Sequence, residues 1–282
     1  MMITFGPGGN SESFGRRKFP EELPDYLRSF GLNGYEIECG RGVRISEKTY
    51  ALLPELAQKN NITLTLHSPY FISLSSENEE TRLKSVSYLL ESAQAAQKLG
   101  ARKIVVHSGS CAKMPRETAL SLSRDTLSRA QAALDENGLS EIVLCPETMG
   151  KINQLGTLSE VLELCKTDER FLPCVDFGHL NARTLGGIKT QADYAAILDE
   201  IEDKLGFERL KKMHVHFSKI QYTAGGEKCH LTFADEEFGP QYEPLMELFA
   251  KRRLEPSVIS ESAGTQAEDA AAMKKSYEGF LK

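Results

Sequence analysis

The chain has 282 residues, of which 40% are hydrophobic and 26% charged, a composition typical of a soluble globular protein. No apolar run approaches the ~20 residues that cross a bilayer, and MMITFGPGGN lacks the features of a signal peptide. The six cysteines contain no CxxC pair, which favours reduced thiols. We therefore expect a cytoplasmic protein with no membrane contact. The formal charge of −6 argues against a general nucleic-acid coat, although cations bound by clustered carboxylates would reverse the local field.

Short apolar runs rich in β-branched residues alternate with longer amphipathic segments along the whole chain. The runs predict strands at 2–5, 34–38, 62–67, 103–107, 141–147, 172–177, 211–217 and 256–261. The segments between them have apolar residues at helical spacing, and two end in glycine, at Gly100 and Gly138. They predict helices at 46–59, 91–100, 120–138, 156–167, 191–205, 241–253 and 266–281.

Strand–helix units of about 30 residues indicate a parallel sheet, and eight such strands close a TIM barrel. An open doubly wound sheet would carry a glycine-rich phosphate loop after its first strand, and GPGGN at 6–10 does not match GxGxxG. No Pro- or Gly-rich linker and no shift in composition marks a second domain. We therefore expect an α/β protein, a single (β/α)8 TIM barrel that spans residues 1–282.

Side chains of the types that bind metals stand at the carboxyl ends of consecutive predicted strands, where barrel enzymes place their chemistry. Imidazole and carboxylate groups are ligands of zinc, manganese and iron. His179 lies one turn beyond the sixth predicted strand, and His230 lies in the long loop after the seventh. The third to eighth strands end with His67, His107, Glu147, Asp176, His214 and Glu261.

A single histidine at the end of an apolar strand is more often a hydrogen-bonded core residue than a ligand. That interpretation weakens when carboxylates from three strands converge in one narrow mouth, because burying them together is costly without a cation. His214 and His216 are two residues apart, so on a strand they point the same way. We expect one of them to be a metal ligand, and the other to support a ligand, contact the substrate or act as a second ligand.

The chain resembles the endonuclease IV family, the family 2 apurinic/apyrimidinic endonucleases, over its whole length. The resemblance rests on motifs in the same order and with comparable spacing: LHSPY, VVHSGS, PETMG, VDFGH, MHVHFSK, KCH and ISES. Members of that family are TIM barrels that hold three zinc ions and cleave the DNA backbone 5′ to an abasic site. The resemblance implies a first metal bound by His67, His107 and Glu147. It implies a second that shares Glu147 and adds Asp176, His214 and Glu261, and a third bound by His179 and His230.

The resemblance also implies roles in catalysis and in DNA binding. Glu147 would bridge two metals, and Glu261 would both bind metal and orient the attacking hydroxide. Tyr70 matches a tyrosine that the family places against the DNA at the lesion. Arg41 lies where the family carries a DNA-probing arginine.

The chain departs from the family two residues before His230, where Lys228 replaces an aspartate ligand. The ammonium of a lysine cannot bind a metal at neutral pH. Several neighbours could take over, and the sequence does not choose among Glu227, Cys229, Asp235 and His216. We therefore expect two or three zinc ions, with manganese as an alternative metal, and Lys228 as a phosphate contact.

The leading hypothesis is a monomeric, metal-dependent phosphodiesterase that acts on damaged double-stranded DNA and needs no protein partner. Basic residues recur after the predicted strands, which favours phosphate contact; they are Arg16, Arg17, Lys18, Arg41, Arg44, Lys113, Arg116, Lys151 and Lys219. The alternative is a single-metal sugar isomerase or epimerase of the xylose isomerase-like barrels, which would use Glu147, Asp176, His214 and Glu261 alone. A third hypothesis is a non-catalytic barrel that retains DNA or metal binding.

Overall fold

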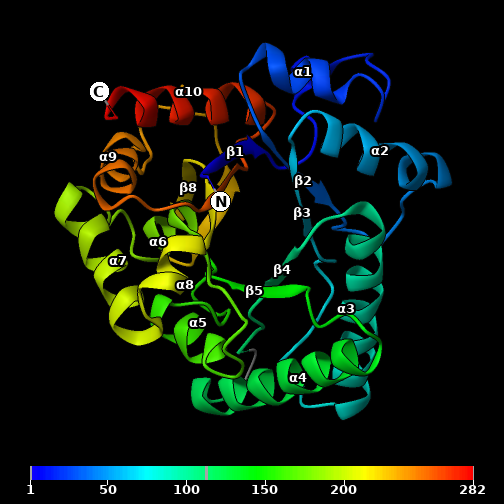
Figure 1. Cartoon of the computed structure of the whole chain (residues 1–282). Helices are drawn as coiled ribbons and strands as arrows, with labels where there is room; N and C mark the ends of the chain where they lie inside the picture. Colours follow the sequence, from blue (N-terminus) through cyan, green and yellow to red (C-terminus); the bar gives the residue numbers. More distant parts are fainter. Residues whose placement is uncertain (1, 112–113, 282) are drawn as a thin grey trace.

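The computed structural model of the protein describes residues 2–111 and 114–281. Parallel strands form one eight-stranded sheet in the order β1-β10-β7-β6-β5-β4-β3-β2, and helices surround it as an outer ring (Figure 1). The two ends of this sheet meet where Gly8 bridges Glu36 and the Gly9 amide donates to the Glu36 carbonyl. The result is a nearly closed barrel, which confirms the predicted TIM-barrel fold.

The barrel strands lie close to their predicted positions, although the first, fifth and sixth begin two residues later than expected and the seventh begins three residues later. They are β1 (Thr4–Pro7), β2 (Gly34–Glu38), β3 (Thr63–His67), β4 (Lys103–His107), β5 (Val143–Glu147), β6 (Cys174–Asp176), β7 (His214–Phe217) and β10 (Ser257–Ser260). Their parallel registers pair Glu38 with His67, His107 with Glu147, and Asp176 with His216. The carboxyl ends of neighbouring strands therefore bring these side chains to one level of the barrel.

Helices follow the strands in the alternation that the sequence predicts. They are α1 (Leu23–Ser29), α2 (Glu47–Lys59), α3 (Glu79–Leu99), α4 (Arg116–Glu136), α5 (Leu158–Cys165), α6 (Phe177–Arg183), α7 (Gln191–Leu205), α8 (Phe207–Lys212), α9 (Glu243–Arg252) and α10 (Gln266–Gly279), with a short 3-10 turn at Glu12–Phe14. The helix α3 begins where the Asn78 side chain accepts backbone hydrogen bonds and ends at Gly100, whose φ of 75° suits glycine. The sequence did not predict the short helices α1, α6 and α8.

The loop predicted after the seventh strand contains a β-hairpin, β8 (Ile220–Thr223) and β9 (Gly226–His230). The strands β8 and β9 are antiparallel, with a register shift between Gln221 and Tyr222. Gly226 bridges Lys151, and the Glu227 amide donates to the Gly150 carbonyl. These bonds tie the hairpin to the loop after β5 and hold its end over the mouth, the opening at the carboxyl ends of the strands.

The interior of the barrel carries a polar layer, whereas the main apolar core lies among the helices and the outer face of the sheet. Glu36, Thr65 and His214 are buried inside the barrel, together with the thiol of Cys174. This layer lies directly below the mouth. Among the described residues, no helix is long and apolar enough to span a membrane. The six cysteines are free thiols, and five of them are buried.

Candidate metal centre

Three groups of imidazole and carboxylate donors meet at the mouth, and the first two share Glu147. The first position joins His67 and His107, from β3 and β4, to Glu147 at the end of β5. The Nε2 atoms of both histidines lie 3.4 Å from Oε2 of Glu147. The Glu147 carboxylate is buried, with 1% of its side chain exposed. The carboxylate at the end of β5 therefore contacts two imidazoles from neighbouring strands.

The second position lies on the other oxygen of Glu147 and includes Asp176, His216 and Glu261. Nδ1 of His216 is 3.1 Å from Oε1 of Glu147 and 3.3 Å from Oε1 of Glu261. Asp176 caps α6, where its Oδ1 accepts the backbone N–H of His179 at 2.7 Å. Oδ2 of Asp176 is buried and accepts no hydrogen bond, although it lies 3.3 Å from Nδ1 of His179, so it remains available to a cation in this group.

The third position consists of His179, Glu227 and His230. His179 lies in the first turn of α6, and Glu227 and His230 come from the hairpin strand β9. Oε2 of Glu227 is 3.4 Å from Nε2 of His179, and the Glu227 side chain lies so close to Gly150 that a Cβ there would be 2.6 Å from Cβ of Glu227. Glu227 therefore lies with the two histidines, whereas Lys228, at the position where the family resemblance implies an aspartate, is exposed.

Hydrogen bonds on the far side of two rings fix which ring nitrogen faces the carboxylates at the mouth. Nδ1 of His67 lies 2.8 Å from the Ser68 carbonyl, and Nδ1 of His179 lies 2.9 Å from the Thr148 carbonyl. A carbonyl only accepts, so Nδ1 carries the hydrogen in both rings. In the neutral ring, Nε2 then presents a lone pair to a carboxylate oxygen, and either a proton or a cation must lie between them. Backbone carbonyls that hold the second ring nitrogen are typical of zinc-binding histidines.

The close packing of imidazoles and carboxylates at the mouth shifts the pKa values of these groups. Burial opposes the charged form of Glu147, but hydrogen bonds from His179, His216 and His67 outweigh it and hold its pKa well below the usual range. Burial also opposes charge on His67, yet Glu147 and nearby carboxylates raise the pKa of His67 to about 10. Burial lowers the pKa of His107 to about 3 and raises that of Glu261 to about 8. In the absence of a cation, the centre therefore holds protons that metal binding would displace.

The structure differs from the sequence prediction at the two histidines of β7. His214 begins the strand, opposite Cys174, and lies one layer deeper than His216, which stands opposite Asp176. His216 therefore joins the second position in place of His214. Because His216 is fully buried, it is a poor candidate for the predicted contact with DNA. The physical reason is the two-residue repeat of a strand, which points both rings inward and leaves only depth to distinguish them.

The mouth opens into a cavity of about 900 Å³ that His67, His107, Glu147, His179, His230 and Glu261 help to line. Arg41, Arg44 and Lys151 also line it, as three of the predicted phosphate contacts. Tyr70 is 55% exposed and stacks on His107 with 5.2 Å between ring centroids. The mouth therefore combines an aromatic side chain and basic side chains with the buried donors.

Other basic residues from the prediction have structural partners instead. Arg116 forms an ion pair with Glu160, at 2.7 Å. Lys219 is buried and donates to the carbonyls of Phe233 and Asp235. Lys113 lies outside the described residues.

Sequence reasoning missed two glutamates on β2, Glu36 and Glu38. Glu38 lines the cavity and accepts a hydrogen bond from the Tyr70 hydroxyl at 3.3 Å, whereas Glu36 is fully buried below it. The signal was present in GYEIE, where two acidic residues alternate with apolar ones in a short strand. Alternation of this kind places both carboxylates on one face, here the inside of the barrel.

Comparisons with known proteins agree with this architecture. The sequence matches the family model described as xylose isomerase-like TIM barrel over residues 24–282. Uncharacterized protein MJ0133 of Methanocaldococcus jannaschii is 31% identical over 277 residues, covering 98% of this chain and 97% of that protein. A probable endonuclease 4 of Mycoplasma pneumoniae is 29% identical over 172 residues, covering 58% of this chain and 57% of that protein.

Solved structures share the fold at lower identity. Endonuclease IV from Thermus thermophilus has a TM-score of 0.71 at 20% identity and covers 99% of this chain and 98% of its own. A D-tagatose 3-epimerase-like protein has the same TM-score and identity, with 99% and 97% coverage. Overall fold alone therefore does not separate a nuclease from an epimerase.

Proposed function

Since the chain belongs to the xylose isomerase-like TIM barrel family, we propose that it is a zinc-dependent endodeoxyribonuclease that hydrolyses the DNA backbone 5′ to abasic sites. The observation that carries this proposal is the set of histidines beyond the carboxylates at the strand ends. His67, His107, His179 and His230 all converge on the mouth, in groups that either contain Glu147 or border it. The sequence similarity to probable endonuclease 4 proteins supports the same activity.

The donors suit two or three zinc ions. The first position offers two imidazoles and a carboxylate, the second offers three carboxylates and an imidazole, and the third again offers two imidazoles and a carboxylate. These are the nitrogen and oxygen ligands that zinc binds, and manganese accepts the same types. Oδ2 of Asp176, which accepts no hydrogen bond, and the opposed lone pairs at His67 and His179 fit cations at all three positions. Glu227 would supply the acidic ligand that Lys228 cannot.

Neighbouring divalent cations supply charge neutralisation for a phosphodiester and lower the pKa of a water molecule. Within this centre, Glu147 would hold the first and second positions at a fixed separation, because its two oxygens face different donors. Glu261 is the most exposed carboxylate of the second position, with 14% of its side chain accessible. It is therefore placed to orient an attacking water and accept a proton from it.

The rim of the cavity would bind the DNA. Arg41, Arg44 and Lys151 offer positive charge to backbone phosphates in a chain whose net charge is −6. Tyr70 presents an exposed ring beside His107, where it could contact the gap left by a missing base. Lys228 is exposed on the hairpin next to Glu227 and is a further phosphate contact.

A second candidate function is a single-metal sugar isomerase or epimerase. The observation that favours it is the self-contained group of Glu147, Asp176, His216 and Glu261, which could hold one cation without the other histidines. The fold likeness to the D-tagatose 3-epimerase-like protein equals that to endonuclease IV. This alternative assigns no metal-binding role to His67, His107, His179 or His230.

Metal analysis combined with an incision assay tests the proposal. The purified protein should contain two or three zinc ions per chain and cut a labelled duplex 5′ to a single abasic site. An undamaged duplex of the same sequence should stay intact, and Glu261→Gln should lose incision. One tightly bound ion, no incision, and interconversion of ketohexoses would instead establish the isomerase.

A further inference from the structure

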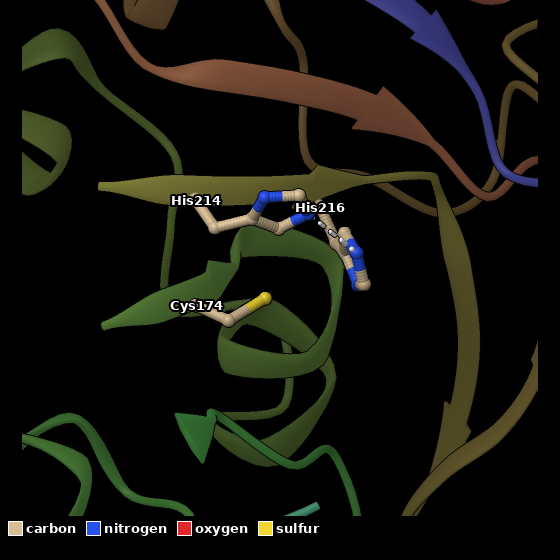
Figure 2. Close-up of side chains that lie close together, drawn as sticks. All are labelled: Cys174, His214 and His216. Carbon is tan, nitrogen blue, oxygen red and sulfur yellow. Dashed lines mark hydrogen bonds between the residues drawn. The ribbon is translucent and has the colours of Figure 1, made fainter. Parts of the chain in front are cut away.

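A sealed polar cluster lies directly beneath the second metal position. It consists of Glu36 on β2, Cys174 on β6, and His214 and His216 on β7, and all four side chains are buried at 0% exposure. Figure 2 shows the two rings on β7 with the Cys174 thiol on the neighbouring strand below them. The mechanism proposed above uses only His216 from this cluster, so the other three groups need an explanation.

The carboxylate of Glu36 is the hub of the cluster. Oε1 of Glu36 lies 2.7 Å from Nε2 of His216, and Oε2 lies 3.0 Å from Nε2 of His214. The Thr65 hydroxyl donates to Oε2 at 2.7 Å. An ionised carboxylate can only accept, so both imidazoles carry their hydrogen on Nε2. Because each histidine uses a different oxygen, the two rings are held side by side, with their Nε2 atoms 3.1 Å apart.

This arrangement fixes which nitrogen of His216 faces the mouth. With the hydrogen on Nε2, the lone pair of the neutral ring is on Nδ1, which points at Glu147 and Glu261. We propose that Glu36 is a positioning residue that locks His216 in the orientation and tautomer required to bind a cation at the second position. His214 completes the lock as a second donor to the same carboxylate. This inference rests on the proposed metal centre but not on its substrate.

A cation inside the cluster is the competing explanation, because Cys174, His214 and His216 offer three donor atoms within 4.8 Å of one another. The geometry favours hydrogen bonds instead. Both Nε2 atoms already have a carboxylate oxygen at 3.0 Å or less, and each carboxylate oxygen is matched to one ring. Carboxylate groups that hold the outer nitrogen of a metal-binding histidine commonly raise metal affinity.

Stepwise titration of the metal-free full chain with zinc, in competition with a chromophoric chelator, tests this role without any DNA. Glu36→Gln keeps the size of the side chain but replaces one acceptor with an amide donor, so one of the two imidazoles must lose its bond or move its hydrogen to Nδ1. We expect one equivalent of zinc to bind about 10–100-fold more weakly, with the remaining equivalents unchanged. Thr126→Val is the matched control, because it removes a buried hydroxyl that donates to the Leu74 carbonyl, away from the centre.

Two results would overturn the assignment. Wild-type affinity for every equivalent in folded Glu36→Gln would show that the carboxylate does not position His216. If Glu36→Gln fails to fold, Thr65→Val is measured instead, because it retains the carboxylate and removes only one of its hydrogen bonds. A smaller loss of zinc affinity at a single equivalent supports the role of Glu36, whereas unchanged affinity refutes it. A cobalt–thiolate absorption band that disappears in Cys174→Ser, but not in Cys229→Ser, would place a cation within the cluster and would also refute it. Incision of DNA does not enter these measurements, so they fail or succeed independently of the proposed activity.

Discussion

Zinc binding at the first metal position should weaken steeply as the pH falls from 8 to 6. Burial opposes charge on His67, but hydrogen bonding to Glu147 and the charge of nearby carboxylates raise its pKa to about 10, so this ring holds a proton throughout the range. Burial lowers the pKa of His107 to about 3, which leaves its ring neutral. Glu147 is already ionised, because its pKa lies well below the usual value. A zinc ion that binds at the first position must therefore displace one proton, which comes from His67.

One displaced proton changes the binding constant tenfold for each pH unit, or about 1.4 kcal/mol, so two units correspond to about 100-fold weaker binding at pH 6 than at pH 8. The slope should be steeper at the second position, because two groups there must lose a proton. They are His216, whose pKa is raised well above its usual value by neighbouring groups although burial lowers it, and Glu261, whose pKa burial raises to about 8. Chelator competition at pH 6, 7 and 8 measures the slope, and calorimetry in buffers of different ionisation enthalpy counts the protons. His107→Asn removes a neutral ligand and should weaken binding without changing the slope. A binding constant that stays level across this range would refute the reasoning.

The other predictions concern single side chains. Glu147→Gln should weaken zinc at both the first and second positions by more than about tenfold, since each loses an anionic ligand; loss of a single equivalent would contradict its bridging role. Glu227→Gln should remove only the third equivalent of zinc, whereas Lys228→Ala should leave the zinc content unchanged. If metal analysis shows that Lys228→Ala loses zinc and Glu227→Gln does not, Glu227 is not a ligand of the third position. Arg41→Ala should weaken binding to an abasic duplex and reduce the salt dependence by about one phosphate contact, measured by fluorescence anisotropy; an unchanged salt slope would remove Arg41 from the interface.

The barrel could be predicted because its signals are local. Each strand is a short apolar run, each long helix carries apolar residues at helical spacing, and eight repeats have one well-known closed solution. The hairpin β8–β9 escaped prediction because β8 has only the four residues IQYT and its partner segment GGEKCH has neither apolar alternation nor β-branched residues. Its strands are held by backbone contacts to the loop after β5, which sequence does not record. The acidic donor Glu227 depends on that hairpin, so it could be considered from the sequence but not chosen.

The sequence could not distinguish His214 from His216 for a different reason. Both rings point into the barrel, and the only difference between them is one layer of depth, which is set by the register of β7 against β6. Register is a property of paired strands, and a one-dimensional pattern does not contain it. The same limit hid Glu36, because its role depends on two histidines that lie about 180 residues away in the sequence.

The orientation of the rings bears on how many cations the centre needs. A single ion bound by Glu147, Asp176, His216 and Glu261 leaves Nε2 of His67 facing Glu147 and Nε2 of His179 facing Glu227, each at 3.4 Å. The hydrogens on Nδ1 are committed to backbone carbonyls, so a one-metal enzyme would have to keep both rings permanently protonated to satisfy these contacts. Cations at the first and third positions satisfy the same atoms with neutral imidazoles, which are the form that zinc binds. Neutral His67 and His179 rings in the metal-loaded protein would therefore support cations at the first and third positions, whereas protonated rings would support a single ion.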